Sequence, residues 1–561
     1  MTPANPADPL VVAPVLLPLG TAALMLLMGE KRRRLKAALN VGSAMLGLLL
    51  AIALLRQVDA SGTPATFAVH LTANWPVPYG IALVADRLSA LMAVLAGIVG
   101  VASLLYALAR WQHGGVYYHG LLQLQLMGLY GAFLTADLFN LFVFFEVLLA
   151  ASYGLLLHGG GTARVRAGLH YIAINLLASL LFLIGVAVLY GVTGTLNMAD
   201  IALKLTQVPA SDRGLLHAGA AILAMAFLAK AAIWPLGFWL QPAYAAASAP
   251  AAALFVILTK VGVYALLRLW TLCFPPEAGA SAGFGGHALV WGGLATLGFG
   301  AVGLFASQQL SRLMGYSVVA SSGTLVAAIG FGLPALAAGA LFYLVTSTLA
   351  GCALFLLVEL LERSREVETG PPQFDDGVQA PGPFLDAEPA PSINLDDEEQ
   401  ALVGLAIPAA LAFLGVSFTL CAMVVAGLPP LGGFIAKLAM LQALLQIGSA
   451  PAWMLFALLI ASGLLAAIAM MRVGIRHFWT ATAALPPRLR VVESLPVAAL
   501  VAALLALVVN GNAVLRYTTQ TAATLHEPQL YIDAVLGALA RPTGGGAGIA
   551  PRPIADARGS P

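Results

Sequence analysis

Four ionisable side chains lie inside long apolar stretches of the sequence, where a charge is costly. They are Glu146 in NLFVFFEVLLAASYG, Lys230 in ILAMAFLAKAAIWPLGF, Lys260 in LFVILTKVGVYALLR and Lys437 in GLPPLGGFIAKLAMLQALL. An ionisable residue in the hydrocarbon region of a membrane costs roughly 2.5–3.5 kcal/mol or more, and by default it marks a functional site. A structural ion pair would account for one such residue, whereas four of them favour the handling of ions or protons.

Glutamate and lysine together can control where a proton is held. A buried lysine without a partner holds its proton weakly because its charged form is poorly solvated, and a nearby carboxylate restores the affinity. Movement of a glutamate toward or away from a lysine therefore switches the lysine between holding and releasing a proton. We interpret Glu146 as the switch partner of Lys230, with Lys260 and Lys437 as the relay and the exit.

Proline interrupts two of the apolar stretches close to these lysines. Pro235 lies in KAAIWPLGFW, and Pro429 and Pro430 lie in GLPPLGGFIAK. Proline removes a backbone donor and clashes with the preceding helical turn, and backbone groups freed at membrane depth must line a cavity or be satisfied by protein. A pair of interrupted helices in corresponding halves of a chain is typical of transporters built from inverted repeats.

Four further ionisable residues lie nearer the ends of apolar stretches. His170 could titrate near neutral pH, and the alternative is a hydrogen-bonded structural histidine. Glu359 could line an inner half-channel, and the alternative is an interfacial carboxylate. We interpret Asp86 and Asp137 as solvated anchors at the outer membrane interface.

The elements that position these residues must be membrane helices. The 561-residue sequence is 60% hydrophobic and only 9% charged, with a mean hydropathy of +0.92, whereas soluble domains carry about 25% charged residues. A net charge of +2 indicates no polyanionic partner. The composition therefore excludes a soluble enzyme and a nucleic-acid-binding protein, and it predicts an all-α polytopic membrane protein surrounded by lipids.

The sequence predicts no cofactor and no metal site. The three cysteines, Cys273, Cys352 and Cys421, are far apart, and we interpret them as small apolar residues. The nine histidines form no tight cluster, and the sequence contains neither a ligand set for haem or an iron–sulfur cluster nor a glycine-rich phosphate loop.

Hydropathy predicts 14 membrane spans, and basic residues orient them. The spans lie near 9–29, 35–55, 81–109, 117–135, 137–158, 167–191, 215–246, 250–273, 287–306, 312–331, 335–361, 401–447, 452–472 and 493–515. Basic residues of five loops fall on one side if the first span runs inward, and they include Arg32, Arg164, Arg312, Arg363 and Arg472. The positive-inside rule then places both termini on the outer side.

Two segments lack the composition of a span. Residues 366–400 are rich in Pro, Asp and Glu, which predicts a disordered or loosely packed cytoplasmic linker. The segment after Arg541 is rich in Gly and Pro and predicts a flexible tail.

The charged and interrupted segments resemble the proton-translocating antiporter family that Mrp-type Na⁺/H⁺ antiporters share with the membrane arm of respiratory complex I. The resemblance covers about residues 86–476 and is most specific in FNLFVFFEVLLAASY, TKVGVYALLR and AGLPPLGGFIAK. It implies that protons move along Glu146, Lys230, Lys260 and Lys437. It also implies about 14 transmembrane helices with two inverted five-helix repeats, in which the seventh and twelfth helices are broken.

This resemblance implies a division of the chain. Residues 1–110 would form three N-terminal helices, residues 111–273 the first repeat, residues 287–472 the second repeat with the linker 366–400, and residues 493–561 a C-terminal helix and tail.

Within the family, LFYLVTSTLAGCALFLLVELLER and RLMGYSVVASSGTL resemble the D-type subunits of Mrp antiporters. This resemblance implies a proton-translocating subunit of a multisubunit Na⁺ or K⁺/proton antiporter in the bacterial cytoplasmic membrane. The implied partners are the other Mrp subunits (A, B, C, E, F and G), and the implied function is a secondary transporter rather than an enzyme.

Two positions depart from the family pattern. Many relatives carry a histidine just after the first helix break, where this chain has Tyr244. Relatives often place His or Gln near Ser321 or Ser322, and a serine cannot store a proton at neutral pH. We therefore expect Ser321 and Ser322, with His170 and Glu359, as the possible proton path beside the four charged residues, with water completing the route between Lys260 and Lys437.

Other readings of the same residues remain. A proton-pumping subunit of complex I or of a membrane-bound hydrogenase would need the same buried charges, because redox cofactors would lie in other chains. A lipid-modifying membrane enzyme is disfavoured because the charges lie within helices rather than at their ends. A scaffold would leave four costly charges unexplained. The sequence does not identify the cation or say which chain binds it.

Overall fold

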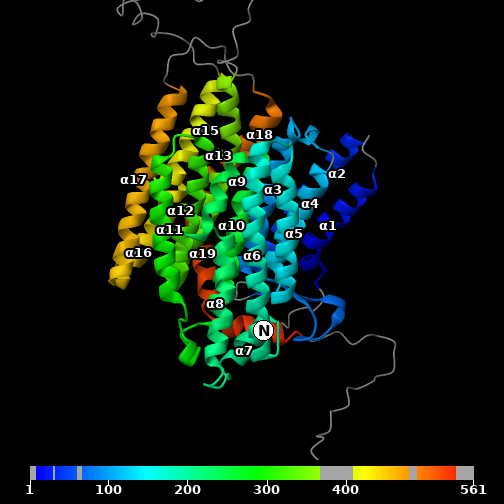
Figure 1. Cartoon of the computed structure of the whole chain (residues 1–561), viewed down its shortest axis with the longest axis vertical. Helices are drawn as coiled ribbons and strands as arrows, with labels where there is room; N and C mark the ends of the chain where they lie inside the picture. Colours follow the sequence, from blue (N-terminus) through cyan, green and yellow to red (C-terminus); the bar gives the residue numbers. More distant parts are fainter. Residues whose placement is uncertain are drawn as a thin grey trace, which may run out of the picture.

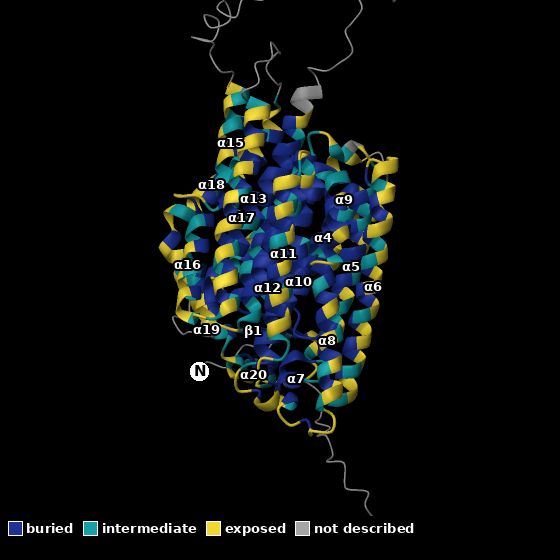
Figure 2. Ribbon diagram, turned by 60° about the vertical axis from the view of Figure 1, so that its left-hand side comes forward, coloured by how far each residue is buried: buried dark blue, intermediate teal, exposed yellow. Residues whose placement is uncertain are grey.

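The computed structural model describes residues 8–28, 32–59, 66–115, 117–366, 409–478 and 489–538. Long, nearly aligned helices form one bundle (Figure 1), and its buried residues fill the centre while most exposed residues face outward (Figure 2). Thirteen helices of the described ranges are long and apolar enough to cross a membrane. The protein is therefore an all-helical, multi-pass membrane protein, as its composition predicts.

The elements follow the chain in a simple order. The α-helices are α1 (Pro9–Leu27), α2 (Arg33–Asp59), α3 (Arg87–Ala107), α4 (Tyr118–Leu134), α5 (Leu138–Leu157), α6 (Thr162–Thr193), α7 (Met198–Leu205), α8 (Arg213–Lys230), α9 (Leu240–Ala246), α10 (Ala249–Cys273), α11 (Gly286–Ala306), α12 (Leu310–Gly330), α13 (Pro334–Glu366), α15 (Ala409–Ala426), α16 (Gly432–Ile447), α17 (Ala450–Phe478), α18 (Val491–Val509), α19 (Gly511–Leu525) and α20 (Pro528–Leu536). Short 3₁₀ helices are η1 (Thr72–Asn74), η2 (Trp111–His113), η3 (Leu236–Trp239) and η4 (Gly279–Ser281).

Each of the 14 predicted spans contains helix in the described residues, and four of them differ in detail. The span predicted near 81–109 begins with strand β2 (Ala82–Ala85), and its helix α3 starts only at Arg87. The span predicted near 215–246 is divided into α8, η3 and α9, and the span near 401–447 is divided into α15 and α16. The last span ends at Val509 rather than near residue 515, because α19 begins separately at Gly511. The predicted linker 366–400, apart from its first residue, and the tail after Arg541 lie outside the described residues.

A small antiparallel hairpin precedes α3 and was not predicted. Strand β1 (Ala68–Leu71) pairs with β2 (Ala82–Ala85), with Ala68 opposite Ala85. The hairpin lies at the same end of the bundle as α7 and α20 (Figure 2), which we call the hairpin end. The opposite end, which we call the basic end, carries the start of α6 and the end of α17 with Arg164, Arg472 and Arg476 (Figure 1).

Two helices form the axis around which the charged residues are arranged. Almost the whole of α10 and of the most apolar stretch of α13 is buried, and the two helices pack against each other. Helices α8 and α12 pack on α10, and α16 packs on α13. Because Lys260 lies on α10, its neighbours on these helices are fixed by packing rather than by loops.

Candidate functional site

The first helix break places Lys230 at the end of α8. The chain leaves helical geometry after Lys230, passes through Pro235 and resumes in η3 and α9. A Cβ on Gly237 would lie 2.2 Å from the carbonyl oxygen of Ala232, so only glycine lets the chain fold back so tightly after the proline. Lys230, 9% exposed, therefore occupies the last turn of a helix that stops within the bundle.

Glu146 and Lys230 are neighbours but do not form a direct ion pair. Lys230 lies against Phe145, the residue before Glu146 in α5, yet no N···O contact within 4.0 Å joins Glu146 and Lys230 among the ion pairs of the described residues. Glu146 accepts a hydrogen bond from the Ser179 hydroxyl of α6. The Lys230 ammonium lies 5.0 Å from the centre of the Phe145 ring, a cation–π distance that partly offsets its lost hydration.

Lys260 lies at the centre of the bundle and contacts a row of hydroxyl groups. Its side chain is 1% exposed, and Nζ donates to Ser321 Oγ of α12 at 2.9 Å. Ser321 Oγ lies 3.1 Å from Ser347 Oγ of α13. A hydroxyl both donates and accepts, so it can pass a proton on without storing one. Sequence reasoning missed Ser347, which had no signal beyond its place in an apolar stretch.

Ser322 differs from its neighbour. Its hydroxyl is fully buried and has no hydrogen-bond partner among the described residues. A buried polar atom in a native protein normally has a partner, and ordered water is the usual one where protein supplies none. The two serines predicted for the relay thus have different surroundings, and only Ser321 contacts a lysine.

The second helix break places Lys437 against free backbone carbonyls. Helix α15 ends at Ala426, and α16 begins at Gly432. Lys437 is 8% exposed, and its Nζ donates to the carbonyl oxygens of Ala426 at 3.0 Å and Val425 at 3.4 Å. These carbonyls belong to the last turn of α15, whose partial negative charge attracts a cation.

The two helix breaks share one feature, a close turn at a glycine just after a proline. A Cβ on Gly433, just beyond Pro430, would lie 2.1 Å from the carbonyl oxygen of Val424, as a Cβ on Gly237 would meet Ala232. The similar strings PLGF and PLGGF thus form similar close turns, and each holds a lysine at a broken helix end. Lys230 precedes its break and Lys437 follows its break.

Two candidates lie away from the lysines. Glu359, near the basic end of α13, accepts a hydrogen bond from Trp111 Nε1 at 2.8 Å and lies 3.9 Å from Arg110. His170 is exposed, and its Nδ1 lies 3.0 Å from the carbonyl oxygen of Arg166 in its own helix. The structure therefore does not bring His170 to the buried lysines. Tyr244, just after the first helix break, donates to the carbonyl oxygen of Phe255.

The interpretation of Asp86 as a solvated anchor is wrong. Asp86 is buried, caps the start of α3 through Ser89, and forms two hydrogen bonds of 2.7 Å with Arg268 of α10. Burial alone would raise the pKa of Asp86, but the charge and hydrogen bonds of Arg268 outweigh it and hold the pKa below its ordinary value. Asp86 is therefore charged at neutral pH. Arg268 was the available signal, since an arginine in LFVILTKVGVYALLR needs a partner.

Asp137 is also buried rather than solvated, so this second anchor assignment is wrong as well. Its carboxylate accepts from the backbone N–H of Asn140 and caps α5, the helix that carries Glu146. Burial raises the pKa of Asp137 against the opposing effect of these backbone hydrogen bonds. Asp137 thus fixes the start of α5, and within the described ranges it forms no ion pair with any of the buried lysines.

Comparisons with known proteins agree on one family. A family model described as NADH:quinone oxidoreductase/Mrp antiporter matches residues 135–373. The chain is similar to the D-type subunit of a probable K⁺/H⁺ antiporter of Rhizobium meliloti, with 49% identity over 540 residues that cover 95% of this chain and 98% of that protein. It is 33% identical to the D-type subunit of the Na⁺/H⁺ antiporter of Alkalihalophilus pseudofirmus over 94% of this chain and 99% of that protein.

A solved structure has the same fold over nearly the whole chain. A chain of the Mrp complex from Dietzia sp. DQ12-45-1b superimposes with a TM-score of 0.78 and 25% sequence identity, covering 94% of this chain and 100% of that chain.

Proposed function

From the finding that this chain belongs to the NADH:quinone oxidoreductase/Mrp antiporter membrane family and is a D-type subunit of the Mrp antiporters, we propose that it moves protons within a multisubunit monovalent cation/proton antiporter. The proposed proton path runs along Glu146, Lys230, Lys260 and Lys437. The observation that carries the proposal is the burial of three lysines at 9%, 1% and 8% exposure. Among the described residues, none of them has a carboxylate within 4.0 Å. Unpaired buried charges are expensive in a membrane and are retained for function.

Glu146 is the switch of the proposed mechanism. When its carboxylate approaches Lys230, the ammonium form is stabilised and the lysine holds a proton. When the carboxylate withdraws, the proton passes toward Lys260. The Glu146 carboxylate lies more than 4.0 Å from Lys230 Nζ and accepts a hydrogen bond from Ser179. Both observations support a carboxylate that alternates between contact with Ser179 and contact with Lys230.

The hydroxyl row is the proposed route onward from Lys260. Ser321 and Ser347 lead from Lys260 to α13, and α13 packs on α16, which carries Lys437. Water completes the gap, and the unpartnered hydroxyl of Ser322 among the described residues supplies a place for it. Glu359 at the basic end is the proposed inner entry, and His170 has no role in this buried row.

The proposal extends to the organisation of the chain. Residues 111–273 and 287–472 form the two repeats, each with one broken helix and one lysine at the break. The basic end faces the cytoplasm, in keeping with the positive-inside rule, and the hairpin end faces outward with both termini. The partners are the other Mrp subunits, and the exchanged ion is K⁺ or Na⁺, the ions named for the two relatives.

Affinity purification of the tagged chain from native membranes tests the assignment. We expect several small membrane proteins and one larger homologue to co-purify, and peptide mass spectrometry identifies them. Peripheral flavin or iron–sulfur subunits in the same preparation would instead support the alternative, a proton-pumping subunit of a redox complex. Recovery of the chain alone would contradict a role in a multisubunit complex.

Ser321→Ala should slow proton transport about tenfold or more, because a hydrogen bond to a charged group contributes roughly 1.5–3 kcal/mol and Ser321 is the partner of Lys260. The rate is measured as cation-dependent proton movement in inside-out membrane vesicles. Thr348→Val is the matched control, since Thr348 is equally buried and bonds only to Leu344 of its own helix among the described residues. Equal rates in the wild type and Ser321→Ala would remove Ser321 from the route.

A further inference from the structure

Three side chains follow one another along α10 toward the hairpin end. Lys260, Tyr264 and Arg268 are spaced four residues apart, so they lie one above the other on one face of the helix. The Tyr264 hydroxyl donates to the carbonyl oxygen of Phe133 on α4, and the Arg268 guanidinium lies 5.6 Å from the centre of the Tyr264 ring. Arg268 thus lies two helical turns of α10 from the central lysine, on the side of the hairpin end.

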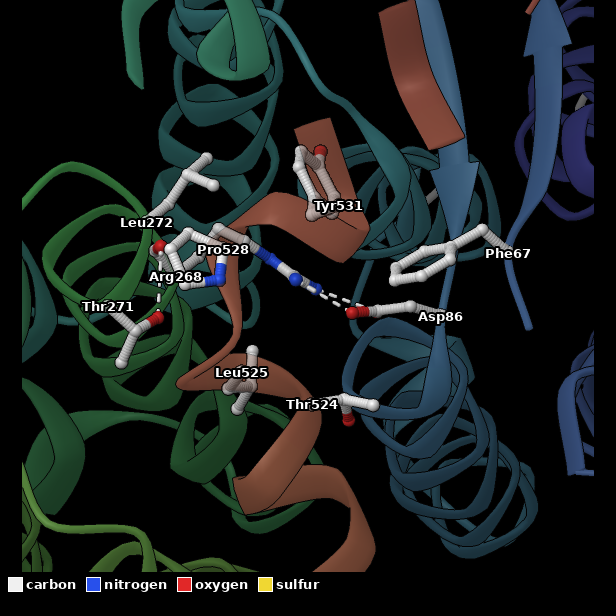
Figure 3. Close-up of a pocket in the computed structure, with 9 residues that line it drawn as sticks. All are labelled: Phe67, Asp86, Arg268, Thr271, Leu272, Thr524, Leu525, Pro528 and Tyr531. Atoms are coloured by element: carbon white, nitrogen blue, oxygen red, sulfur yellow. Dashed lines mark hydrogen bonds and ion pairs between the residues drawn. The ribbon is translucent and has the colours of Figure 1, made fainter. Parts of the chain in front are cut away.

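Arg268, the last of these three side chains, forms a buried ion pair with Asp86. Its two terminal nitrogens each lie 2.7 Å from a carboxylate oxygen of Asp86, as the paired dashed lines in Figure 3 show. Both residues are below 10% exposed. A buried ion pair often contributes no more stability than well-packed apolar residues of the same volume. Stability alone therefore does not explain why the bundle keeps charges here.

The C-terminal segment covers the pair from the hairpin end. The ring centre of Tyr531 on α20 lies 5.2 Å from the Arg268 guanidinium. Leu525 and Pro528 from the same segment approach the pair from one side, and Phe67 lies on the other (Figure 3). Between these residues remains a cavity of about 10 Å³, which is room for about one water molecule.

We propose that the Asp86–Arg268 pair, covered by α20, is a closed outer gate on the proposed proton path, at Lys260. The inference rests on the proposed function, because a gate has meaning only if Lys260 carries protons. In the closed state the pair and Tyr531 keep outside water from Lys260. Release of Arg268 from Asp86 lets water from the small cavity beside the pair reach Lys260, which can then exchange its proton. Asp86 and Arg268 are positioning residues, and they carry no proton themselves.

Asp86→Asn tests the gate without removing the helix cap, because Asn caps a helix as well as Asp. The complex is purified and incorporated into liposomes that contain a pH-sensitive dye, and proton entry is measured under an imposed pH difference without any monovalent cation gradient. We expect a several-fold increase in this leak. The double variant Asp86→Asn with Lys260→Gln should return to the wild-type leak, because the leak passes through Lys260.

Two further variants keep the result interpretable. Loss of one charge of a buried pair can prevent assembly. Tyr531→Ala therefore serves as a second variant, because it removes the aromatic ring that covers the pair and leaves the pair itself intact. We expect the same increase in proton leak. Lys204→Gln is the control, since Lys204 forms a partly exposed pair with Asp200 on α7 at the same end. It should leave the leak unchanged.

The outcomes separate the gate from the proposed function. Assembled Asp86→Asn and Tyr531→Ala complexes without an increased leak would overturn the gate, as would a leak that persists after Lys260→Gln. Either result would leave the proposed function intact if cation-driven transport still depends on Glu146. If Glu146→Gln transports like the wild type, the proposed function fails as well.

Discussion

Glu146→Gln is expected to lower cation-driven proton transport to about one hundredth or less of the wild-type rate, the smaller end of what a positioned proton-transfer group contributes. Glutamine has nearly the volume of glutamate and still accepts the hydrogen bond from Ser179. It removes the negative charge that acts on Lys230. In the proposed mechanism this charge switches the lysine between its two states, so proton movement should stop while the bundle remains folded.

Inside-out membrane vesicles provide the measurement for this variant. Respiration acidifies the vesicle interior, and addition of Na⁺ or K⁺ then dissipates the pH difference if the antiporter works. Asp200→Asn is the matched control, because Asp200 is also a buried carboxylate near a lysine but lies on α7, away from the row. It should respond to cation like the wild type. Full dissipation by the Glu146→Gln complex would exclude Glu146 as the switch.

Lys437→Met is expected to abolish the same transport by removing the charge at the second helix break. Methionine has nearly the length of the lysine side chain, so packing against α15 is largely kept. The lost group is the ammonium that donates to the carbonyl oxygens of Ala426 and Val425. Without it the proposed path ends at the hydroxyls around Lys260, and no proton passes on to α16.

The amount of assembled complex separates transport loss from misfolding in this variant. Blue native electrophoresis should show Lys437→Met at wild-type abundance, alongside an exposed substitution on the same helix, Gln442→Met, that keeps full transport. Wild-type transport by the Lys437→Met complex would show that the row ends before α16. A Gln442→Met complex without transport would show that α16 tolerates no substitution, and would remove the support that Lys437→Met gives.

The four charges within apolar stretches and the two helix breaks could be predicted because a membrane makes them conspicuous, although only the three lysines are buried and Glu146 is half-buried. A charge costs so much in hydrocarbon that Glu146 and the three lysines are visible in a sequence that is 60% hydrophobic. Prolines mark the breaks for a similar reason, since they cannot continue a helix. The close turns at Gly237 and Gly433 then follow from the chain geometry.

Partners far apart in the chain could not be predicted. Asp86 and Arg268 are 182 residues apart, and Asp86 was interpreted as an interfacial anchor without reference to Arg268. Ser347 gave no signal, because a serine in an apolar helix is common and its contact with Ser321 depends on how α12 and α13 pack. His170 was predicted near the path, but helical periodicity in an apolar span does not say which face meets the bundle.

The hairpin β1–β2 was missed because each strand has only four residues. The second strand, ALVA, is wholly apolar and falls within the span predicted near 81–109, so it shows no alternation of polar and apolar residues. The hairpin matters nonetheless, since it delivers Asp86 to the start of α3.

Proton flux through the purified complex in liposomes tests most directly whether protons pass along the buried charges. A Na⁺ or K⁺ gradient is imposed across the membrane, and the internal pH is followed with an enclosed dye for the wild type, Glu146→Gln and Lys437→Met. The account predicts a cation-driven pH change with the wild type and the rate of protein-free liposomes with both variants. A wild-type rate in either variant, at equal amounts of assembled complex, would contradict it.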